Sequence, residues 1–216
     1  MNYNIISTGS KGNAVVLENK ILIDCGVSFK ALRNVFKDIQ LVLLTHEHTD
    51  HIKLSTLKRL IKERPTLRVG CCEWMIEKVL KCGISTSRLD VYEISKIYNY
   101  REFKISPVKL YHNVPNCGYR LFFNNKKVLY ATDTNSLNGI SAKHYDLYMI
   151  ECNYEDTEIQ HRISEKQSKG GFAYEMNVIN NHLSKQKCDD FIVENAGPNS
   201  EFVYLHQHEE RKQDIT

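Results

Sequence analysis

The chain has 216 residues, of which 42% are hydrophobic and 25% charged, and its formal net charge is +3 at pH 7. This length suits one large domain over residues 1–216, and so small a charge permits an anionic partner without identifying one. Seven cysteines form no CxxC pair, the opening lacks a signal-peptide pattern and no apolar run has membrane-spanning length. We therefore expect a cytoplasmic protein without disulfides or a membrane span.

The first third of the chain alternates short apolar runs with turns, which is typical of β-strands. The predicted strands are residues 3–7, 14–19, 20–26 and 40–45. The last of them, QLVLLT, is apolar and β-rich throughout, which suits a fully buried strand. Helices are predicted over residues 28–38, 51–64 and 73–83. Pro65 and Gly83 mark the ends of the second and third helices.

The rest of the chain begins rich in strands and becomes helical. The predicted strands are residues 103–112, 118–123, 126–133, 146–153 and 201–206. Asn124 and Asn125 form the turn of a hairpin. Helical segments are predicted over residues 156–180 and 184–196. This order of strands and helices predicts two packed β-sheets with helices outside them.

The segment 45-THEHTDH-51 places three histidines and an aspartate directly after a predicted buried strand. His46 and His48 are two residues apart and can point the same way, while Asp50 and His51 stand at the turn into the next helix. Imidazole and carboxylate groups are ligands of zinc and similar metals. Four such side chains are more than one tetrahedral site takes from a single loop, so the segment predicts two adjacent metal ions.

Two metal ions need further ligands, ideally including a carboxylate that bridges them. Three candidates each follow an apolar strand elsewhere in the chain: His112, Asp133 and His206. Loops that follow such strands gather at one rim of a sheet, where these side chains could meet the first loop. His182, in 180-NNHLSK-185, stands in a loop before a predicted helix.

These motifs resemble those of a known family. The segment THEHTDH matches the HxHxDH signature of the metallo-β-lactamase superfamily, and His112, Asp133 and a late histidine occur in the family's order. The opening ISTGSKGNAVVLENKILIDCG, the strand DLYMIECNYE and the motif HLS are similar to those of its YycJ-like branch of single-domain phosphodiesterases and nucleases. The resemblance covers nearly the whole chain. It implies an α/β protein with an αββα four-layer sandwich, in which two mixed β-sheets are flanked by helices.

The resemblance also implies the roles of individual residues. Seven side chains would bind two metal ions: His46, His48 and His112 the first, Asp50, His51 and His206 the second, and Asp133 both. Asp24 would orient the metal-binding loop from behind the ligands, and His182 would protonate the leaving group. The last ligand falls in 203-VYLHQHEE-210, where His208 is an alternative to His206. We prefer His206 because it directly follows the apolar strand.

The implied activity is hydrolysis by a hydroxide that bridges two divalent metal ions and is oriented by Asp133. Zinc is the expected metal, and manganese and iron are alternatives because nitrogen and oxygen ligands suit all three. Such a centre can hydrolyse phosphodiesters, thioesters, lactones or β-lactams. The branch resemblance and His182 favour a phosphodiesterase that acts on nucleic acid or on linear or cyclic nucleotides.

Other classes of function remain open on the sequence. A thioester or lactone hydrolase is the main alternative. A di-iron oxidoreductase would usually have Glu in place of His48, and a non-catalytic binding protein would normally have lost ligands. The chain has no room for a large inserted cap domain, so we expect an open site or one that a second subunit of a homodimer completes.

Overall fold

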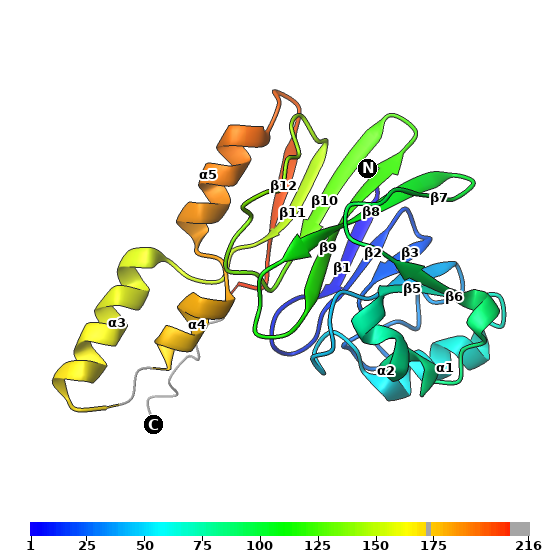
Figure 1. The fold of residues 1–216 in the computed structure, drawn as a ribbon, viewed down its shortest axis with the longest axis horizontal. Coiled ribbons are helices and arrows are strands. Elements are labelled where there is room, and N and C mark those ends of the chain that lie inside the picture. Colours follow the sequence, from blue (N-terminus) through cyan, green and yellow to red (C-terminus); the bar gives the residue numbers. More distant parts are fainter. Residues whose placement is uncertain (172–173, 208–216) are drawn as a thin grey trace.

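Two six-stranded β-sheets pack face to face in the computed structural model, which describes residues 1–171 and 174–207 (Figure 1). The first sheet has the strand order β1 (Tyr3–Ser7), β2 (Ala14–Leu17), β3 (Ile21–Ile23), β4 (Leu41–Leu43), β5 (Arg68–Cys72) and β6 (Leu89–Tyr92). The second has the order β12 (Glu201–Leu205), β11 (Leu147–Glu151), β10 (Lys126–Ala131), β9 (Asn116–Phe123), β8 (Phe103–Leu110) and β7 (Tyr98–Asn99).

Both sheets mix antiparallel and parallel pairs. In the first sheet β1, β2 and β3 pair antiparallel, and β3 to β6 pair parallel. In the second, β7 to β10 pair antiparallel, and β10, β11 and β12 pair parallel. Strands β8 and β10 both run antiparallel to β9, so they share their direction with β11 and β12. The loops that follow these four strands therefore leave the second sheet at the same rim.

Alternation of side chains along the strands creates the layers, because successive residues of a strand face opposite sides of its sheet. In β4, Leu41 and Leu43 pack between the two sheets, whereas Val42 packs toward the helices outside the first sheet. In β11, Met149 faces the space between the sheets, and Ile150 packs toward the helix outside the second sheet. Strands that are buried on both faces read as continuous apolar runs, as the sequence showed.

Helices cover the outer faces of both sheets (Figure 1). The first sheet is covered by α1 (Leu54–Glu63) and α2 (Ile76–Leu80), with 3₁₀ turns η1 (Glu73–Met75) and η2 (Thr86–Arg88) beside α2 and before β6. The second is covered by α5 (Lys185–Asn195), whose first turn is capped by the Ser184 hydroxyl. Helices α3 (Asp156–Ser168) and α4 (Glu175–Asn181) pack together beyond the end of β11. The predicted four layers are thus present.

Four predicted helices differ from the structure, and the one predicted over residues 73–83 is the 3₁₀ turn η1 followed by the short helix α2. Residues 28–38 form successive turns, because most of their backbone hydrogen bonds join residues three apart, as from Leu32 N–H to the Phe29 carbonyl. The helix predicted from residue 51 begins at Leu54, since the Lys53 N–H bonds to the Cys25 carbonyl instead. The segment 156–180 is two helices, and Gly170, with φ of +68°, ends the first.

Two further expectations concern cysteines and membranes. All seven cysteines are buried and free of disulfide bonds, in agreement with the expectation from their spacing. Within residues 1–171 and 174–207, no helix is long and apolar enough to cross a membrane.

Candidate metal centre

The candidate ligands meet where the two sheets end at the same rim. The loop after β4 supplies four of them, and the residues that follow β8, β10 and β12 supply one each. Their ligand atoms form three groups, within each of which all atoms lie within 4.8 Å of one another. The groups are His46, His48, His112 and Asp133; Asp50, His51 and Asp133; and Asp133, Glu151, His182 and His206. Asp133 belongs to all three and lies at the centre.

The first group has the composition that the resemblance implies. His48 Nδ1 lies 3.2 Å from His46 Nε2 and 3.3 Å from His112 Nε2. Asp133 Oδ2 lies 3.5 Å from His46 Nε2 and 4.0 Å from His112 Nε2. The other ring nitrogens of His46 and His112 are held by residues outside the group. His46 Nδ1 lies 3.0 Å from the Thr45 hydroxyl, and His112 Nδ1–H donates to the Asn181 carbonyl. Three nitrogens and one carboxylate oxygen therefore face one point.

The second expected set is divided between two groups. His51 Nε2 lies 2.9 Å from Asp133 Oδ2 and 3.6 Å from Asp50 Oδ2. His206 Nδ1 contacts the other carboxylate oxygen of Asp133, and it lies 3.1 Å from Glu151 Oε1. Asp50 and His51 therefore approach Asp133 from one side, and His206 approaches it from another. His208 lies outside the described residues, so only His206 is placed.

The donor set fits divalent metal ions. His206 Nδ1 is buried beside two carboxylates, yet it has no hydrogen bond of good geometry among the described residues. A buried polar atom without such a bond costs free energy, and a cation would satisfy it. Nitrogens that face one another across 3.2 and 3.3 Å present lone pairs to the same point, as zinc ligands do.

The surroundings lower the pKa of some histidines in the cluster and raise that of others. Burial, reinforced by His51, lowers the pKa of His46, which is therefore neutral and able to bind a metal. Burial opposes protonation of His51 as well, but the carboxylates of Asp133 and Asp24 outweigh it and raise its pKa. The pKa of His206 rises to about 10 for the same reason, against burial and because of Asp133 and Glu151. A bound cation would take the place of these protons.

Asp24 supports the loop of candidate ligands, residues 46–51, from behind. Its carboxylate is fully buried and accepts from the Thr45 N–H at 3.0 Å and from the Thr45 hydroxyl. Its Oδ2 also accepts from His51 Nδ1–H at 2.7 Å, which leaves His51 Nε2 facing Asp133. The backbone adds to this support, because the Cys25 N–H bonds to the His51 carbonyl. The strand end that carries Asp24 thus sets the orientation of the His51 ring.

Three site residues adopt the left-handed backbone region that side chains rarely occupy. Asp24, Asp133 and His206 have φ of 59°, 58° and 49°. Asp24 and His206 stand directly after a β-strand and Asp133 stands two residues after one, where the chain must turn while the side chain faces the rim. Strain of this kind persists where surrounding contacts hold it, and it is found preferentially at functional sites.

Glu151 is a site residue that the sequence analysis missed. It is fully buried at the end of β11, and its Oε1 lies 2.6 Å from His182 Nδ1. Its Oε2 accepts from the backbone N–H groups of Thr134 and Leu183. Burial alone would raise its pKa, but the hydrogen bond from His182 and the nearby imidazole of His206 lower it, so Glu151 is ionised. The sequence offered one signal for this residue, because Glu151, like Asp133, is a carboxylate near the end of a buried strand.

Asn13 is a second residue that the sequence analysis missed. It is buried in the loop after β1, and its side chain links that loop to the loop of candidate ligands. Its Oδ1 accepts from the Gly9 N–H, and its Nδ2 lies 2.8 Å from His51 Nε2 and 3.5 Å from Asp50 Oδ2. In the same loop, the Thr8 hydroxyl accepts from the His206 N–H at 2.8 Å. The motif TGSKGN therefore contacts three candidate ligands, a role that it shows only in three dimensions.

Comparisons with known proteins show which family and which relatives the chain resembles. The family model described as "Beta-lactamase superfamily domain" matches residues 19–177. The exodeoxyribonuclease WalJ of Streptococcus pneumoniae is 26% identical over 224 residues, which cover 94% of this chain and 80% of that protein. The exodeoxyribonuclease YycJ of Bacillus anthracis is 28% identical over 148 residues, or 62% of this chain and 54% of that protein.

Solved structures show the same fold at lower sequence identity. The metallo-beta-lactamase fold protein YhfI of Bacillus subtilis superposes with a TM-score of 0.71 at 16% identity and covers 95% of this chain and 86% of its own. The short form of human tRNase Z superposes with a TM-score of 0.69 at 15% identity, and the match covers 97% of this chain and 93% of that one. The predicted four-layer fold is confirmed by these similarities.

Proposed function

The chain belongs to the metallo-β-lactamase superfamily, and from this membership we propose that it is a metal-dependent phosphodiesterase that acts on nucleic acid. The observation that carries the proposal is the pairing of His182 with the buried Glu151 beside the candidate metal centre. The relatives named exodeoxyribonuclease WalJ and exodeoxyribonuclease YycJ support the same substrate class. So does a ribonuclease Z of Clostridium beijerinckii, 33% identical over 125 residues.

The candidate ligands would hold two divalent cations, for which zinc suits the nitrogen and oxygen donors. His46, His48 and His112 would hold one, Asp50, His51 and His206 the other, and Asp133 both. The position of Asp133 supports its shared role, since its two oxygens face different histidines. Such cations supply Lewis-acid polarisation of an ester oxygen and a lowered pKa for an attacking water.

His182 has the contacts of a general acid. Its Nδ1–H is held by Glu151 at 2.6 Å, which fixes the ring and its tautomer. Its Nε2, on the opposite edge of the ring, would carry a proton to the leaving oxygen. The ring centroid lies 5.0 Å from that of His206 and 5.4 Å from that of His112, so the proton would be delivered beside the candidate ligands. Glu151 would act through His182, as a positioning residue.

This pairing favours phosphodiesters over thioesters. The leaving group of a nucleic-acid phosphodiester is an alkoxide, which departs poorly unless it is protonated, whereas a thiol, with a pKa near 8.5, departs readily as its anion. A held imidazole beside the centre would therefore contribute more to the first reaction than to the second.

The proposal is tested by a hydrolysis screen with protein reconstituted with zinc or manganese. The substrates are bis-p-nitrophenyl phosphate, cyclic mononucleotides, single- and double-stranded DNA, RNA and a thioester. We expect turnover of a nucleic acid and of bis-p-nitrophenyl phosphate. Turnover of the thioester alone would refute a phosphodiesterase.

The role of His182 has its own test. His182→Ala should retain the metal content of the wild type and lose roughly 10²–10⁴-fold in turnover of an oligonucleotide. Turnover of bis-p-nitrophenyl phosphate should fall less, because p-nitrophenolate leaves without protonation. Loss of metal would instead identify His182 as a ligand. The metal content is worth measuring because the ligand atoms of His182, Asp133, Glu151 and His206 lie close together.

A further inference from the structure

A groove of about 500 Å³ opens at the rim beside the candidate metal centre. It lies between the end of β8, the loop that follows this strand and the loop after β10, and its walls include Lys109, Tyr111, His112 and Asn135. We call it the Tyr111 groove. Because His112 is both a candidate ligand and part of the wall, a molecule in the groove would lie next to a metal ion held by that histidine. A volume of this size suits a small organic ligand such as one nucleotide.

Tyr111 offers an aromatic surface to the groove. It is 41% exposed, although its backbone is held in place. Its N–H donates to the Thr134 hydroxyl at 2.9 Å, and its carbonyl accepts from the Asn135 N–H at 2.9 Å. Thr134 and Asn135 directly follow Asp133 in the chain. These hydrogen bonds therefore join the exposed tyrosine to the loop that carries the central carboxylate of the site.

Lys109 adds a positive charge beside the ring. Its Nζ lies 5.3 Å from the centroid of the Tyr111 ring, within the range of a cation–π contact. Within the described part of the chain, no carboxylate pairs with this ammonium group. A second ammonium group borders the groove, since Lys187 Nζ lies 3.5 Å from the Asn135 carbonyl oxygen. The residues that line the groove include no Asp or Glu, so its charge favours an anion.

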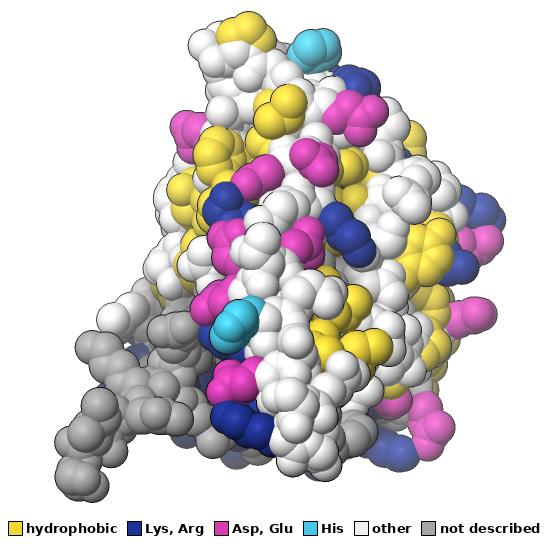
Figure 2. All heavy atoms as spheres, turned by 90° about the vertical axis from the view of Figure 1, so that its left-hand side faces the viewer, with side chains coloured by type: hydrophobic (Ala, Val, Ile, Leu, Met, Phe, Trp, Pro, Cys, Tyr) yellow, Lys and Arg dark blue, Asp and Glu magenta, His cyan; other side chains and the backbone are white. Residues whose placement is uncertain are grey.

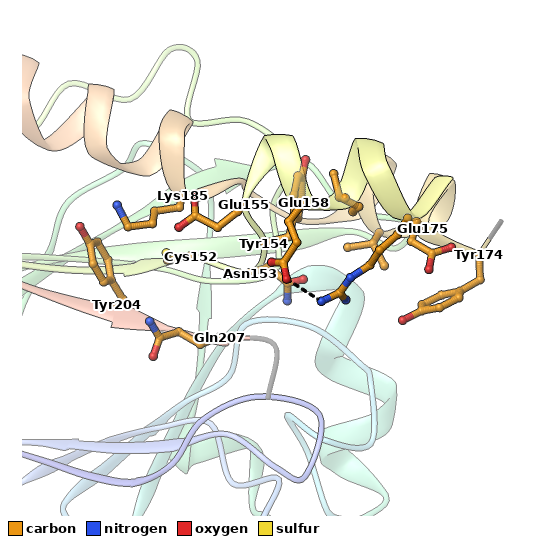
Figure 3. A pocket seen from close by; sticks show the side chains of 13 residues that line it. Cys152, Asn153, Tyr154, Glu155, Glu158, Tyr174, Glu175, Lys185, Tyr204 and Gln207 are labelled. Carbon is orange, nitrogen blue, oxygen red and sulfur yellow. Dashed lines mark hydrogen bonds and ion pairs between the residues drawn. The ribbon is translucent and has the colours of Figure 1, made fainter. Parts of the chain in front are cut away.

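A second cavity has a different balance of charge. It measures about 250 Å³ and lies between α3, α4 and the ends of β11 and β12 (Figure 3). The two cations that line it are paired, Arg162 with Glu158 at 2.9 Å and Lys185 with Asp189 at 2.6 Å. The carboxylates that line it outnumber these cations and are Glu155, Glu158 and Glu175. On the surrounding face, acidic and basic side chains are intermixed over α3 and α5 (Figure 2). A polyanion therefore fits the Tyr111 groove better than the second cavity.

We propose that the Tyr111 groove binds an unpaired nucleotide of the substrate, with its base stacked on Tyr111 and its phosphate beside Lys109. This inference rests on the proposed action on nucleic acid. Stacking on a side chain needs an open face of the base, and in a duplex the neighbouring base pairs cover both faces. Aromatic rings stack on any base, and lysine contacts phosphate whatever the sequence. The groove would thus select single strands or frayed ends without selecting a base.

The test measures hydrolysis of a single-stranded oligothymidylate by the metal-loaded wild type and variants. Removal of one stacking ring weakens binding by roughly 5- to 150-fold, so Tyr111→Ala should raise KM by about that factor. Tyr111→Phe keeps the ring and loses only the hydroxyl, so it should restore the KM of the wild type. Metal content and thermal melting verify that each variant is loaded and folded.

Tyr174→Ala is the matched control for Tyr111→Ala. Tyr174 is 44% exposed and lines the second cavity, so its replacement should leave KM close to that of the wild type. If Tyr174→Ala raises KM and Tyr111→Ala does not, the base occupies the second cavity and the inference is wrong.

Lys109→Gln tests the phosphate contact. Each cation that contacts a phosphate of a single strand contributes about 0.7 to the slope of the logarithm of the binding constant against the logarithm of salt concentration. In Lys109→Gln the corresponding slope of log KM should therefore become shallower by about 0.7. Lys104→Gln is the control and should keep the wild-type slope, because Lys104 is an exposed lysine of the same strand outside the groove. An unchanged slope in Lys109→Gln would overturn the phosphate contact.

Binding of two monophosphates separates failure of this inference from failure of the proposed function. Deoxyadenosine 5′-monophosphate carries a base and 2-deoxyribose 5-phosphate does not, so calorimetry of both with the metal-loaded protein reports on stacking even if no oligonucleotide is hydrolysed. The wild type should bind the first more tightly, and Tyr111→Ala should lose this difference. Equal binding of both by the wild type, or a folded Tyr111→Ala that keeps the wild-type preference, would overturn the inference. Hydrolysis of the oligothymidylate in that case would leave the proposed function intact.

Discussion

Gly26 allows the loop of candidate ligands to lie close against the strand end that supports it. A Cβ atom added at Gly26 would lie 1.7 Å from the Asp50 carbonyl oxygen and 2.8 Å from the His51 nitrogen. Both are backbone atoms, so no side-chain rotation relieves the contact. Real Cβ contacts are essentially never below 3.0 Å, so in Gly26→Ala the loop would have to move by about 1.3 Å.

That displacement exceeds what a metal site tolerates, since ligand distances are held to about 0.2 Å. We expect Gly26→Ala to weaken metal binding at Asp50 and His51 and to cost about 1–3 kcal/mol of unfolding free energy, as overpacking does. For a chain of this size, each kcal/mol lowers the melting temperature by about 2–4 °C. Metal content by plasma mass spectrometry and thermal melting with and without a chelator measure the two effects.

Gly171→Ala is the matched control. Among the described residues, its added Cβ would meet only the Lys166 carbonyl oxygen, at 3.4 Å, an ordinary contact distance. It should leave metal content and melting temperature close to those of the wild type. If Gly26→Ala also binds metal with wild-type stoichiometry and affinity and melts at the wild-type temperature, the contact with Asp50 does not set the loop's position.

Three further predictions address other parts of the site. Glu151→Gln should keep the metal content but lower oligonucleotide turnover by roughly 10²–10⁴-fold, with a smaller loss on bis-p-nitrophenyl phosphate; equal losses on both substrates would argue against positioning of His182. Asn13→Ala should weaken metal affinity by about 10–100-fold in chelator competition, and unchanged affinity would show that this amide does not support the site. In the metal-free protein, His206 has a pKa near 10, raised from about 6.5 in the unfolded chain. Protonation of His206 therefore stabilises the folded protein fully below about pH 6.5. This contribution declines as the pH rises toward about 10, so the melting temperature should fall over that range. A melting temperature that rises over this pH range would contradict the prediction.

The repeated short patterns of the chain were enough to predict most of the architecture. Apolar runs bounded by turns predicted the strands, because burial on both faces of a sheet imposes such runs. The spacing THEHTDH and the residues that end apolar strands predicted the candidate ligands. Membership of the superfamily and similarity to the YycJ-like branch are confirmed by the comparisons. Residues 28–38 were predicted wrongly, because helical spacing of apolar residues does not distinguish a helix from successive turns over one short segment.

Only the tertiary structure could decide which side chains complete the site. Glu151 contacts a histidine 31 residues further along the chain, and Asn13 contacts one 38 residues further along. Neither lies in a local pattern with its partner, because the two meet only where the rims of both sheets converge. A cavity lined by Tyr154 and Glu175 has the same origin, since α3 and α4 enclose it only when packed against the ends of β11 and β12. The sequence by itself predicted most of the strands, though not β5, and the loop of candidate ligands, because local spacing encodes burial and ligand chemistry. Their supporting hydrogen bonds depended on the packing of distant segments.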